Sequence, residues 1–255
     1  MADAVLVDFR DDGTTVITIN RPHARNAVNR AVAEGVAAAL DELDRRDDQV
    51  VGVITGAGGT FCSGMDLKAF LAGERPVVEG RGLAGITEAP PRKPMIAAVE
   101  GYALAGGCEI VLACDMVVAA RDARFGIPEV KRGLVAAAGG LLRLPHRIPY
   151  QVAMEIALTG DFLEAGRAHA YGLVNRLAEP GAALEDALEL ARTIAANGPL
   201  AVRATKQVIA EAATWPPEEE WARMRAVTGP VFASEDAKEG PRAFAEKRAP
   251  RWTGR

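Results

Sequence analysis

The centre of the chain is organised by the stretch Gly101-Tyr102-Ala103-Leu104-Ala105-Gly106-Gly107-Cys108-Glu109. It continues an apolar run of strand length at 94–101, and it leads into the apolar segment 108–113, which has the composition of a buried helix. The glycine pair between them lets the backbone turn tightly and approach a ligand closely. We therefore predict a buried strand, a glycine turn and a buried helix in that order.

Glu109 brings a carboxylate into that apolar segment. In the first turn of a helix it is either a partner of the helix dipole or a functional group retained at a desolvation cost. Glu129 follows Phe125-Gly126-Ile127-Pro128 at the end of another predicted strand. It is either a surface acid or a second functional carboxylate, so the two residues are candidates for a paired acid and base.

An earlier part of the chain repeats the pattern of strand and glycine turn. An apolar run at 50–55 precedes a glycine loop at 56–60 and the turn Cys62-Ser63-Gly64-Met65-Asp66. This turn and the one at 105–109 can each present free backbone N–H groups, and two such donors aimed at one point form an oxyanion hole. Neither loop has the Gly-Lys-Ser/Thr ending of a P-loop or the spacing of a dinucleotide-binding turn.

The flanking segments predict an α/β fold. Alternation of apolar residues over 5–20 around an Asp-Asp-Gly turn predicts a hairpin. Apolar residues at helical spacing predict a helix over 29–46 with Asn29 as its N-cap. The stretch 73–91 is rich in glycine, proline and charge, and we expect it to be a surface loop that is mobile without ligand.

The C-terminal part of the sequence is helical without strand runs. The predicted helices cover 184–196, 199–212, 217–227 and 234–247. We therefore divide the chain into a core at 1–195 and a helical segment at 196–255. The aromatic residues of this segment need a surface to pack on, which is either the chain's own core or another subunit.

Composition excludes several classes of function. The 30 Lys and Arg residues do not outnumber the 34 Asp and Glu, so the net charge of -4 argues against a nucleic-acid partner. The 3 cysteines lack the spacing of a zinc site or a disulfide framework and favour a reducing compartment. The sequence has no recognisable secretory signal and no apolar run of membrane-spanning length, so we expect a cytoplasmic protein without a membrane partner.

Taken in order, the motifs resemble the crotonase (enoyl-CoA hydratase/isomerase) superfamily over nearly the whole chain. The residues that carry the resemblance are Asn20-Arg21-Pro22, Arg25-Asn26-Ala27, Thr55-Gly56, Phe61-Cys62-Ser63-Gly64-Met65-Asp66-Leu67, the stretch 101–109, Cys114-Asp115, Phe125-Gly126-Ile127-Pro128-Glu129 and Glu239–Arg248. The resemblance implies a crotonase-like spiral of ββα repeats that forms two nearly perpendicular sheets. It also implies a C-terminal helical segment that assembles trimers, often paired into hexamers.

The resemblance further implies an enoyl-CoA hydratase, which adds water reversibly and syn across the double bond of a trans-2-enoyl-CoA without metal or redox cofactor. Glu109 is then the base on the water, Glu129 exchanges the proton at the α-carbon, and the N–H groups of Met65 and Gly106 form the oxyanion hole. The residues expected at the substrate and CoA are Arg25, Ala27, Gly64, Asp66, Leu67, Lys68, Ala103 and Lys247.

Two departures from the family pattern affect the expected acyl site. Residues 135–140 read Val-Ala-Ala-Ala-Gly-Gly where Pro-Gly-Ala-Gly-Gly is common, and Met65 stands where many hydratases carry Ala. Both leave the backbone donors in place and leave the length and shape of the acyl group open. The alternatives are an isomerase or other enolate chemistry on an acyl-CoA, and a non-catalytic protein that binds CoA thioesters.

Overall fold

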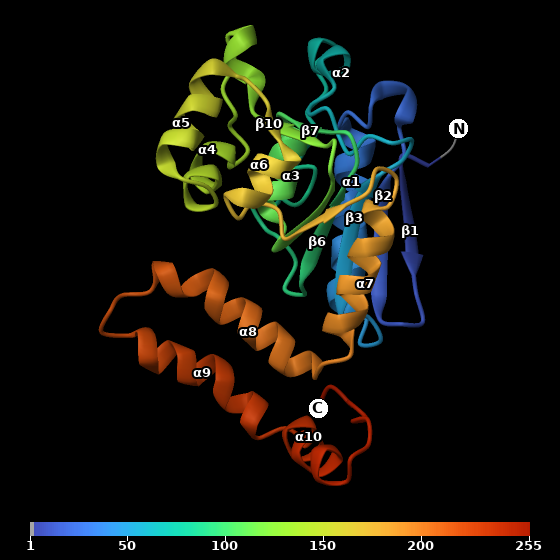
Figure 1. The fold of residues 1–255 in the computed structure, drawn as a ribbon, viewed down its shortest axis with the longest axis vertical. Helices are drawn as coiled ribbons and strands as arrows, with labels where there is room; N and C mark the ends of the chain where they lie inside the picture. Colours follow the sequence, from blue (N-terminus) through green and yellow to red (C-terminus); the bar gives the residue numbers. More distant parts are fainter. Residues whose placement is uncertain (1–2) are drawn as a thin grey trace.

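The computed structural model describes residues 3–255, and its largest element is a six-stranded sheet (Figure 1). Its strands, in spatial order, are β1 (Val5–Phe9), β2 (Thr14–Ile19), β3 (Val51–Gly56), β6 (Met95–Val99), β8 (Met116–Ala120) and β11 (Arg176–Ala178). β1 and β2 form the predicted antiparallel hairpin, and every other neighbouring pair is parallel. The parallel strands need helices on both faces, because their apolar runs are buried on both sides.

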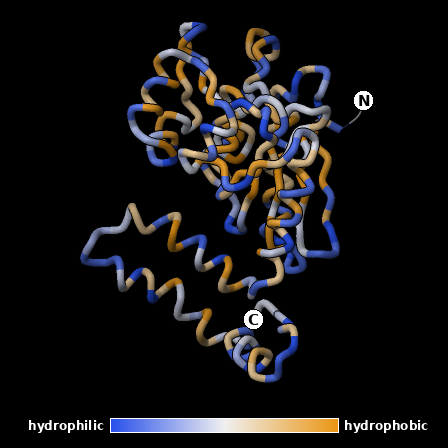
Figure 2. Tube along the Cα trace, viewed as in Figure 1, coloured by the Kyte–Doolittle hydropathy of each residue, from blue (hydrophilic) through white to orange (hydrophobic). Residues whose placement is uncertain are grey.

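Alternation along the strands divides the core between those two faces. Ile17 and Ile54 face α1 (Arg30–Arg45), whereas Val16 and Val53 face α7 (Ala183–Ala195) on the other side. The predicted cap of α1 is confirmed, since the Asn29 side chain accepts a hydrogen bond from the Val32 N–H at 3.1 Å. Figure 2 shows apolar residues concentrated in this body of the molecule.

The chain passes directly from the first sheet into a second one. β6 ends at Val99, the chain turns at Gly101, and β7 (Tyr102–Leu104) continues in a three-stranded sheet with the order β10-β9-β7. The central strand is β9 (Arg124–Gly126), which pairs with β7 on one side and with β10 (Leu163–Glu164) on the other. Two strands followed by a helix occur as β1-β2-α1 and as β6-β7-α3, which agrees with the ββα repeats expected from the sequence.

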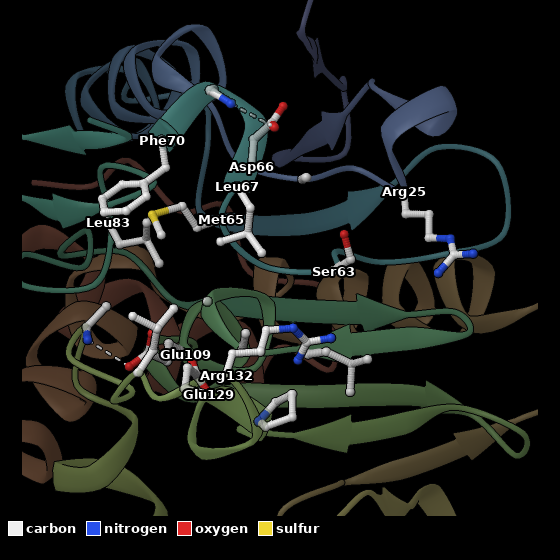
Figure 3. Close-up of a pocket in the computed structure, with 18 of the residues that line it drawn as sticks. Arg25, Ser63, Met65, Asp66, Leu67, Phe70, Leu83, Glu109, Glu129 and Arg132 are labelled. Carbon is white, nitrogen blue, oxygen red and sulfur yellow. Dashed lines mark hydrogen bonds between the residues drawn. The ribbon is translucent and has the colours of Figure 1, made fainter. Parts of the chain in front are cut away.

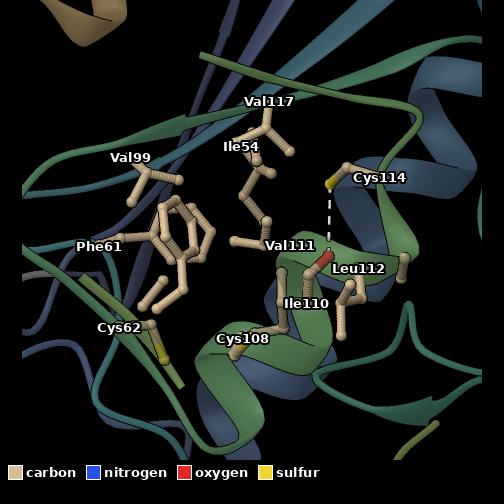
Figure 4. Close-up of a cluster of buried hydrophobic side chains, with 14 of the residues drawn as sticks. Ile54, Phe61, Cys62, Val99, Cys108, Ile110, Val111, Leu112, Cys114 and Val117 are labelled. Carbon is tan, nitrogen blue, oxygen red and sulfur yellow. Dashed lines mark hydrogen bonds between the residues drawn. The ribbon is translucent and has the colours of Figure 1, made fainter. Parts of the chain in front are cut away.

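The helix that follows β7 is buried all round, as its composition predicts. All residues of α3 (Gly106–Ala113) are buried, Glu109 included. Figure 4 shows its apolar side chains packed among residues from the first sheet. Burial raises the pKa of each cysteine thiol in this region to about 12, so that Cys62, Cys108 and Cys114 stay protonated at neutral pH.

The segment 73–91 differs from the surface loop that its composition suggests. It contains a short hairpin, β4 (Val77–Val78) and β5 (Gly82–Leu83), and residues 82–87 are buried. Apolar residues within the segment explain the difference, because Leu83 and Ile86 join the main core below α1. The prediction of a surface loop is therefore wrong for 82–87.

The other elements are short or helical. They are α2 (Leu67–Leu71), α4 (Gly140–Arg143), α5 (Tyr150–Thr159), α6 (Ala165–Ala170), α8 (Pro199–Glu211), α9 (Glu220–Phe232), α10 (Glu235–Ala245) and the 3-10 turns η1 (Pro22–Ala24), η2 (Pro128–Arg132), η3 (Leu144–His146) and η4 (Ala212–Thr214). Within residues 3–255, no helix combines the length and the apolar character needed to cross a membrane.

The last three helices extend away from the sheets (Figure 1). Lys206 on α8 fastens them to the core, because its ammonium donates to the Lys93 carbonyl at 2.9 Å and to the Asp115 carboxylate at 2.7 Å. Ser234 caps α10, and its hydroxyl accepts a hydrogen bond from the Ala237 N–H. Large apolar side chains on these helices are exposed in the single chain: Ile209, Trp221, Phe232 and Phe244.

Asn26 joins the loop before α1 to the glycine loop after β3. Its carboxamide oxygen accepts from the Arg21 N–H at 2.9 Å, and its amide donates to the carbonyls of Ala57 at 2.8 Å and Thr60 at 2.7 Å. The side chain is fully buried, and its φ of 55° lies in the left-handed region that Asn tolerates well. This clamp sets the position of Arg25 and Ala27 on either side of it.

Asn26→Ala should lower the free energy of unfolding by about 3 kcal/mol or more, because it leaves buried backbone groups unpaired and puts Ala at a left-handed φ. Asn197→Ala is the matched control, since its exposed amide makes one hydrogen bond to Thr193, and it should cost only about 0.5 kcal/mol. Urea unfolding at one protein concentration measures both. Equal losses would show that the clamp does not stabilise the fold.

Candidate active site

A pocket of about 1020 Å³ opens between the two sheets' loops and the N-terminus of α3 (Figure 3). Its wall brings together most of the residues predicted from the sequence. The predicted residues that line it are Arg25, Ala27, Met65, Asp66, Leu67, Lys68, Gly106, Glu109 and Glu129. The candidate site therefore lies where the chain passes from one sheet to the other.

The amides of Met65 and Gly106 are free to bind a ligand. Met65 pairs with Val28 in an isolated parallel bridge whose hydrogen bonds use the Gly64 carbonyl and the Asp66 N–H, which leaves the Met65 N–H outside the ladder. Gly106 is the first residue of α3, so its N–H has no partner within the helix. Neither amide donates to another group within residues 3–255.

Close backbone packing holds these two amides near each other. A Cβ on Gly106 would lie 3.6 Å from the Met65 nitrogen, and a Cβ on Gly107 would overlap the Cys62 carbonyl. Ala105, between β7 and α3, adopts a φ of 51°, which is a strained conformation for a residue with a Cβ. This turn starts α3 against the 62–65 backbone, and Met65 and Gly106 both line the pocket.

Two residues expected at the CoA contribute to this packing instead of lining the pocket. Ala103 is fully buried and forms a bridge with Cys62. Gly64 is buried too, and a Cβ there would lie 2.7 Å from the Ala105 Cβ. The structure thus places Ala103 and Gly64 behind the pocket wall, where they fix the geometry of the amides.

Glu109 is held by the loop that follows η2. Its Oε1 accepts from the Ala138 N–H at 2.7 Å and from the Gly140 N–H at 2.9 Å, and only 3% of the residue is exposed. Burial raises the pKa of Glu109, and the two amide hydrogen bonds oppose that rise because they favour the ionised carboxylate. The unusual sequence of 135–140 therefore does not remove the hydrogen bonds to Glu109, because backbone N–H groups donate them.

Glu129 lies beside Glu109 and has a different environment (Figure 3). It stands in the first turn of η2, and its Oε2 is buried with no hydrogen-bond partner among the residues that the structure describes. Burial raises the pKa of Glu129, and the negative charge of Glu109 raises it further. Two neighbouring carboxylates in which only one accepts hydrogen bonds that favour its ionised form are an arrangement suited to paired base and acid catalysis.

The mouth of the pocket carries two of the cationic residues expected at the CoA. Arg25 and Lys68 are exposed at the wall and make no ion pair within residues 3–255. Asp66, by contrast, uses its carboxylate inside the protein: it caps α2 through the N–H groups of Lys68 and Ala69 and pairs with Arg21 at 3.0 Å. Its contribution to the pocket is therefore to hold the loop that presents Lys68.

Lys247 is not brought to this pocket by the fold of a single chain. It follows α10, which lies at the opposite end of the molecule from α2 and the pocket (Figure 1). The separation follows from the tail, because Trp252 donates to the Ala196 carbonyl at 2.8 Å and the Arg255 carbonyl accepts from the Glu235 N–H at 2.7 Å, which hold α10 at the base of α8.

Several pocket residues did not stand out in the sequence. They are Phe70, Leu83, Arg132, Leu134 and Phe162. Arg132 could have been found, because it follows Glu129 by three residues and a 3-10 turn places such residues on one side. Leu83 could not, since it reaches the pocket from the segment 73–91, whose burial depends on contacts distant in sequence.

Gly64→Ala should reduce kcat with crotonyl-CoA, the kind of substrate that the sequence resemblance implies, by roughly 10²-fold to 10³-fold, the usual loss when one oxyanion donor is displaced. The added Cβ has to push Ala105 away, which separates the Met65 and Gly106 amides. Gly80→Ala is the matched control, because Gly80 has a φ of 70° but open space around it. If both variants kept the same kcat, the spacing of the two amides would be irrelevant to turnover.

Comparisons with known proteins show which family the chain resembles. The family described as enoyl-CoA hydratase/isomerase matches residues 10–255. The crystal structure of enoyl-CoA hydratase from Mycobacterium tuberculosis H37Rv superposes with a TM-score of 0.97 at 63% identity, covering 99% of this chain and 100% of the other. The curated enoyl-CoA hydratase EchA19 of M. tuberculosis is 43% identical over 253 residues, which are 95% of this chain and 94% of that protein.

Relatives with a different name lie nearly as close in sequence. Carnitinyl-CoA dehydratase of Salmonella typhi is 42% identical over 249 residues, 94% of each chain. The crystal structure of carnitinyl-CoA hydratase from Mycobacterium avium shares 44% identity and a TM-score of 0.79, with 100% of both chains covered. The crotonase fold predicted from the sequence is confirmed by these likenesses. The chain belongs to the enoyl-CoA hydratase/isomerase family of the crotonase superfamily.

Proposed function

We propose that the protein is an enoyl-CoA hydratase that converts a trans-2-enoyl-CoA into a 3-hydroxyacyl-CoA in fatty acid or related acyl-CoA degradation. The observation that carries the proposal is the pair of adjacent pocket carboxylates, Glu109 and Glu129, in one cavity with two free amides. Enolate chemistry alone needs the amides and one base. Addition of water needs two positioned proton-transfer groups, and this pocket provides both.

In the proposed reaction the ionised Glu109 takes a proton from water while the water oxygen bonds to C3. The electrons of the double bond move toward the thioester, and the N–H groups of Met65 and Gly106 hold the negative charge that develops on its oxygen. Glu129 then gives its proton to C2. The different environments of the two acids support these roles, because Glu109 has two amide donors and Glu129 has a buried oxygen without one.

No metal or redox cofactor takes part in this proposal, since carboxylates move both protons and amide dipoles hold the charge. The CoA part of the substrate lies along Arg25, Ala27, Leu67 and Lys68 at the mouth of the pocket. Cationic side chains at a cavity entrance suit its phosphate groups. We expect the protein to work in the cytoplasm.

Lys247 could contact that CoA only from a second copy of the chain, because α10 is remote from the pocket of its own chain. We therefore propose that residues 196–255 form an oligomerisation segment. The exposed side chains of Trp221, Phe232 and Phe244 support this assignment, since large apolar groups gathered on projecting helices mark protein interfaces.

The second candidate is a carnitinyl-CoA dehydratase, which relatives at 42% and 44% identity support. The same two acids would serve addition and loss of water, so the candidates differ in the acyl group. Comparing crotonyl-CoA with crotonobetainyl-CoA separates them. Migration of the double bond without hydration would favour an isomerase, and binding of either compound without turnover would favour a non-catalytic protein.

Light scattering at micromolar concentration should give the mass of a trimer or of a dimer of trimers, because the apolar faces of α9 and α10 need to be covered. Trp221→Glu together with Phe232→Glu should shift the mass toward the monomer. Glu220→Gln, on the same helix, is the control and should leave the mass unchanged. A monomeric wild-type chain would contradict the oligomerisation segment.

Glu109→Gln and Glu129→Gln should each lower kcat with crotonyl-CoA by about 10²-fold to 10⁴-fold, the usual contribution of a general acid or base. Binding of a CoA thioester should change only several-fold, because the amide donors are untouched. The double variant should lose much less than the product of the two single losses, since both groups act on one water and one enolate.

Glu88→Gln is the matched control for these two variants. Glu88 also lines the pocket, but it is exposed and makes no side-chain hydrogen bond within residues 3–255. Its kcat should stay near that of the wild type. Loss of hydration in Glu129→Gln with full activity in Glu109→Gln would indicate a mechanism with one acid. That result would favour an isomerase over a hydratase.

A further inference from the structure

Arg143 is a half-buried cation that the proposed reaction does not use. It ends α4, directly after the loop that binds Glu109, and its Nη2 donates to the Thr87 carbonyl at 2.6 Å. The guanidinium also fills the space beside Gly139, where an added Cβ would overlap it. Arg143 thus contacts both the 137–140 loop and the buried 82–87 stretch that supplies Leu83 to the pocket.

No carboxylate forms an ion pair with Arg143 within residues 3–255. A cation that is withdrawn from water without an ion pair costs free energy, so its place requires a compensating interaction. The negative charge that offsets the positive charge of Arg143 is that of Glu109. The carboxylate of Glu109 is bound by the loop that precedes Arg143. The positive charge of Arg143 accordingly lowers the pKa of Glu109, against the effect of burial.

We propose that Arg143 is a positioning residue that holds the Glu109 carboxylate in its orientation for catalysis, by fastening the 137–140 loop to the carbonyl of Thr87. The inference rests on the proposed role of Glu109 as the base. Loss of this link removes the contact between the Arg143 side chain and Thr87, so the loop that presents the Ala138 and Gly140 amides to Glu109 is held less firmly. The same link connects the loop that binds Glu109 to the 82–87 stretch, whose Leu83 lines the pocket.

The other charged and titratable groups around these two residues are few. Glu129 on η2 faces Glu109 in the pocket, and Cys114 at the end of α3 lies near Arg143 with its thiol protonated. Arg147 acts on Arg143 by repulsion and is itself exposed. Arg143 is therefore the cation whose removal should change the proton affinity of Glu109, and Arg147 is the neighbour whose removal should not.

The test is the pH dependence of kcat/KM for crotonyl-CoA in Arg143→Met, Arg143→Lys and Arg147→Met. A base works only when ionised, so activity falls as the pH falls through the pKa of Glu109. Loss of the Arg143 charge raises that pKa, and the acid limb of the Arg143→Met profile should move to higher pH. Its kcat on the plateau should fall roughly 10-fold to 100-fold, as expected for a displaced catalytic group.

Arg143→Lys keeps the charge and should hold the acid limb close to that of the wild type, while still losing kcat because an ammonium cannot span the same contacts. Arg147→Met should reproduce the wild-type profile. If Arg143→Met does not fold, Arg143→Gln replaces it with the same expectation. An acid limb that stays in place in the folded neutral variant overturns the positioning role.

Failure of the proposed function gives a different result. If Glu109 is not the base, Glu109→Gln keeps the acid limb and the rate of the wild type, and the Arg143 variants then carry no information about it. If Glu109→Gln abolishes the limb while Arg143→Met leaves it unmoved, the proposed function stands and the inference about Arg143 is wrong.

Discussion

The structure depends on one close approach, in which the N-terminus of α3 packs against the backbone of residues 62–65. Gly107 permits it, because any side chain there would collide with the Cys62 carbonyl. Gly64 permits it from the other side, and Ala105 accepts a strained φ to make the turn. As a result, two backbone N–H groups from segments distant in sequence face one cavity, and Glu109 follows one turn later along α3.

The second physical constraint is the burial of two carboxylates beside those amides. Burial favours the protonated form of both, and the protein divides their behaviour by unequal hydrogen bonding. Two amides on Glu109 favour its charge, and that charge in turn favours the proton on Glu129. The two acids thus differ in hydrogen bonding within one pocket, through backbone contacts that tolerate the unusual 135–140 sequence.

Local patterns in the sequence predicted the elements that local interactions build. The hairpin at 5–20, the Asn29 cap, the buried strands and the buried helix α3 were all found where the patterns placed them. What local patterns could not predict depends on distant contacts: the burial of 82–87 under α1, the capping use of Asp66, and the link from Arg143 to Thr87. Glu109 and Glu129 were recognised through the ordered family motifs, because neither acid is distinctive alone.

The central claim, that two acids act on one water and one enolate, is tested most directly by the product formed in D2O. Crotonyl-CoA incubated with the wild-type enzyme and examined by proton NMR should give 3-hydroxybutyryl-CoA with one deuterium at C2, syn to the new hydroxyl, and none at C4. A product with the double bond moved to C3–C4, deuterium at C2 and no hydroxyl would contradict the account, because it would mean that a proton is moved from C4 to C2 without addition of water.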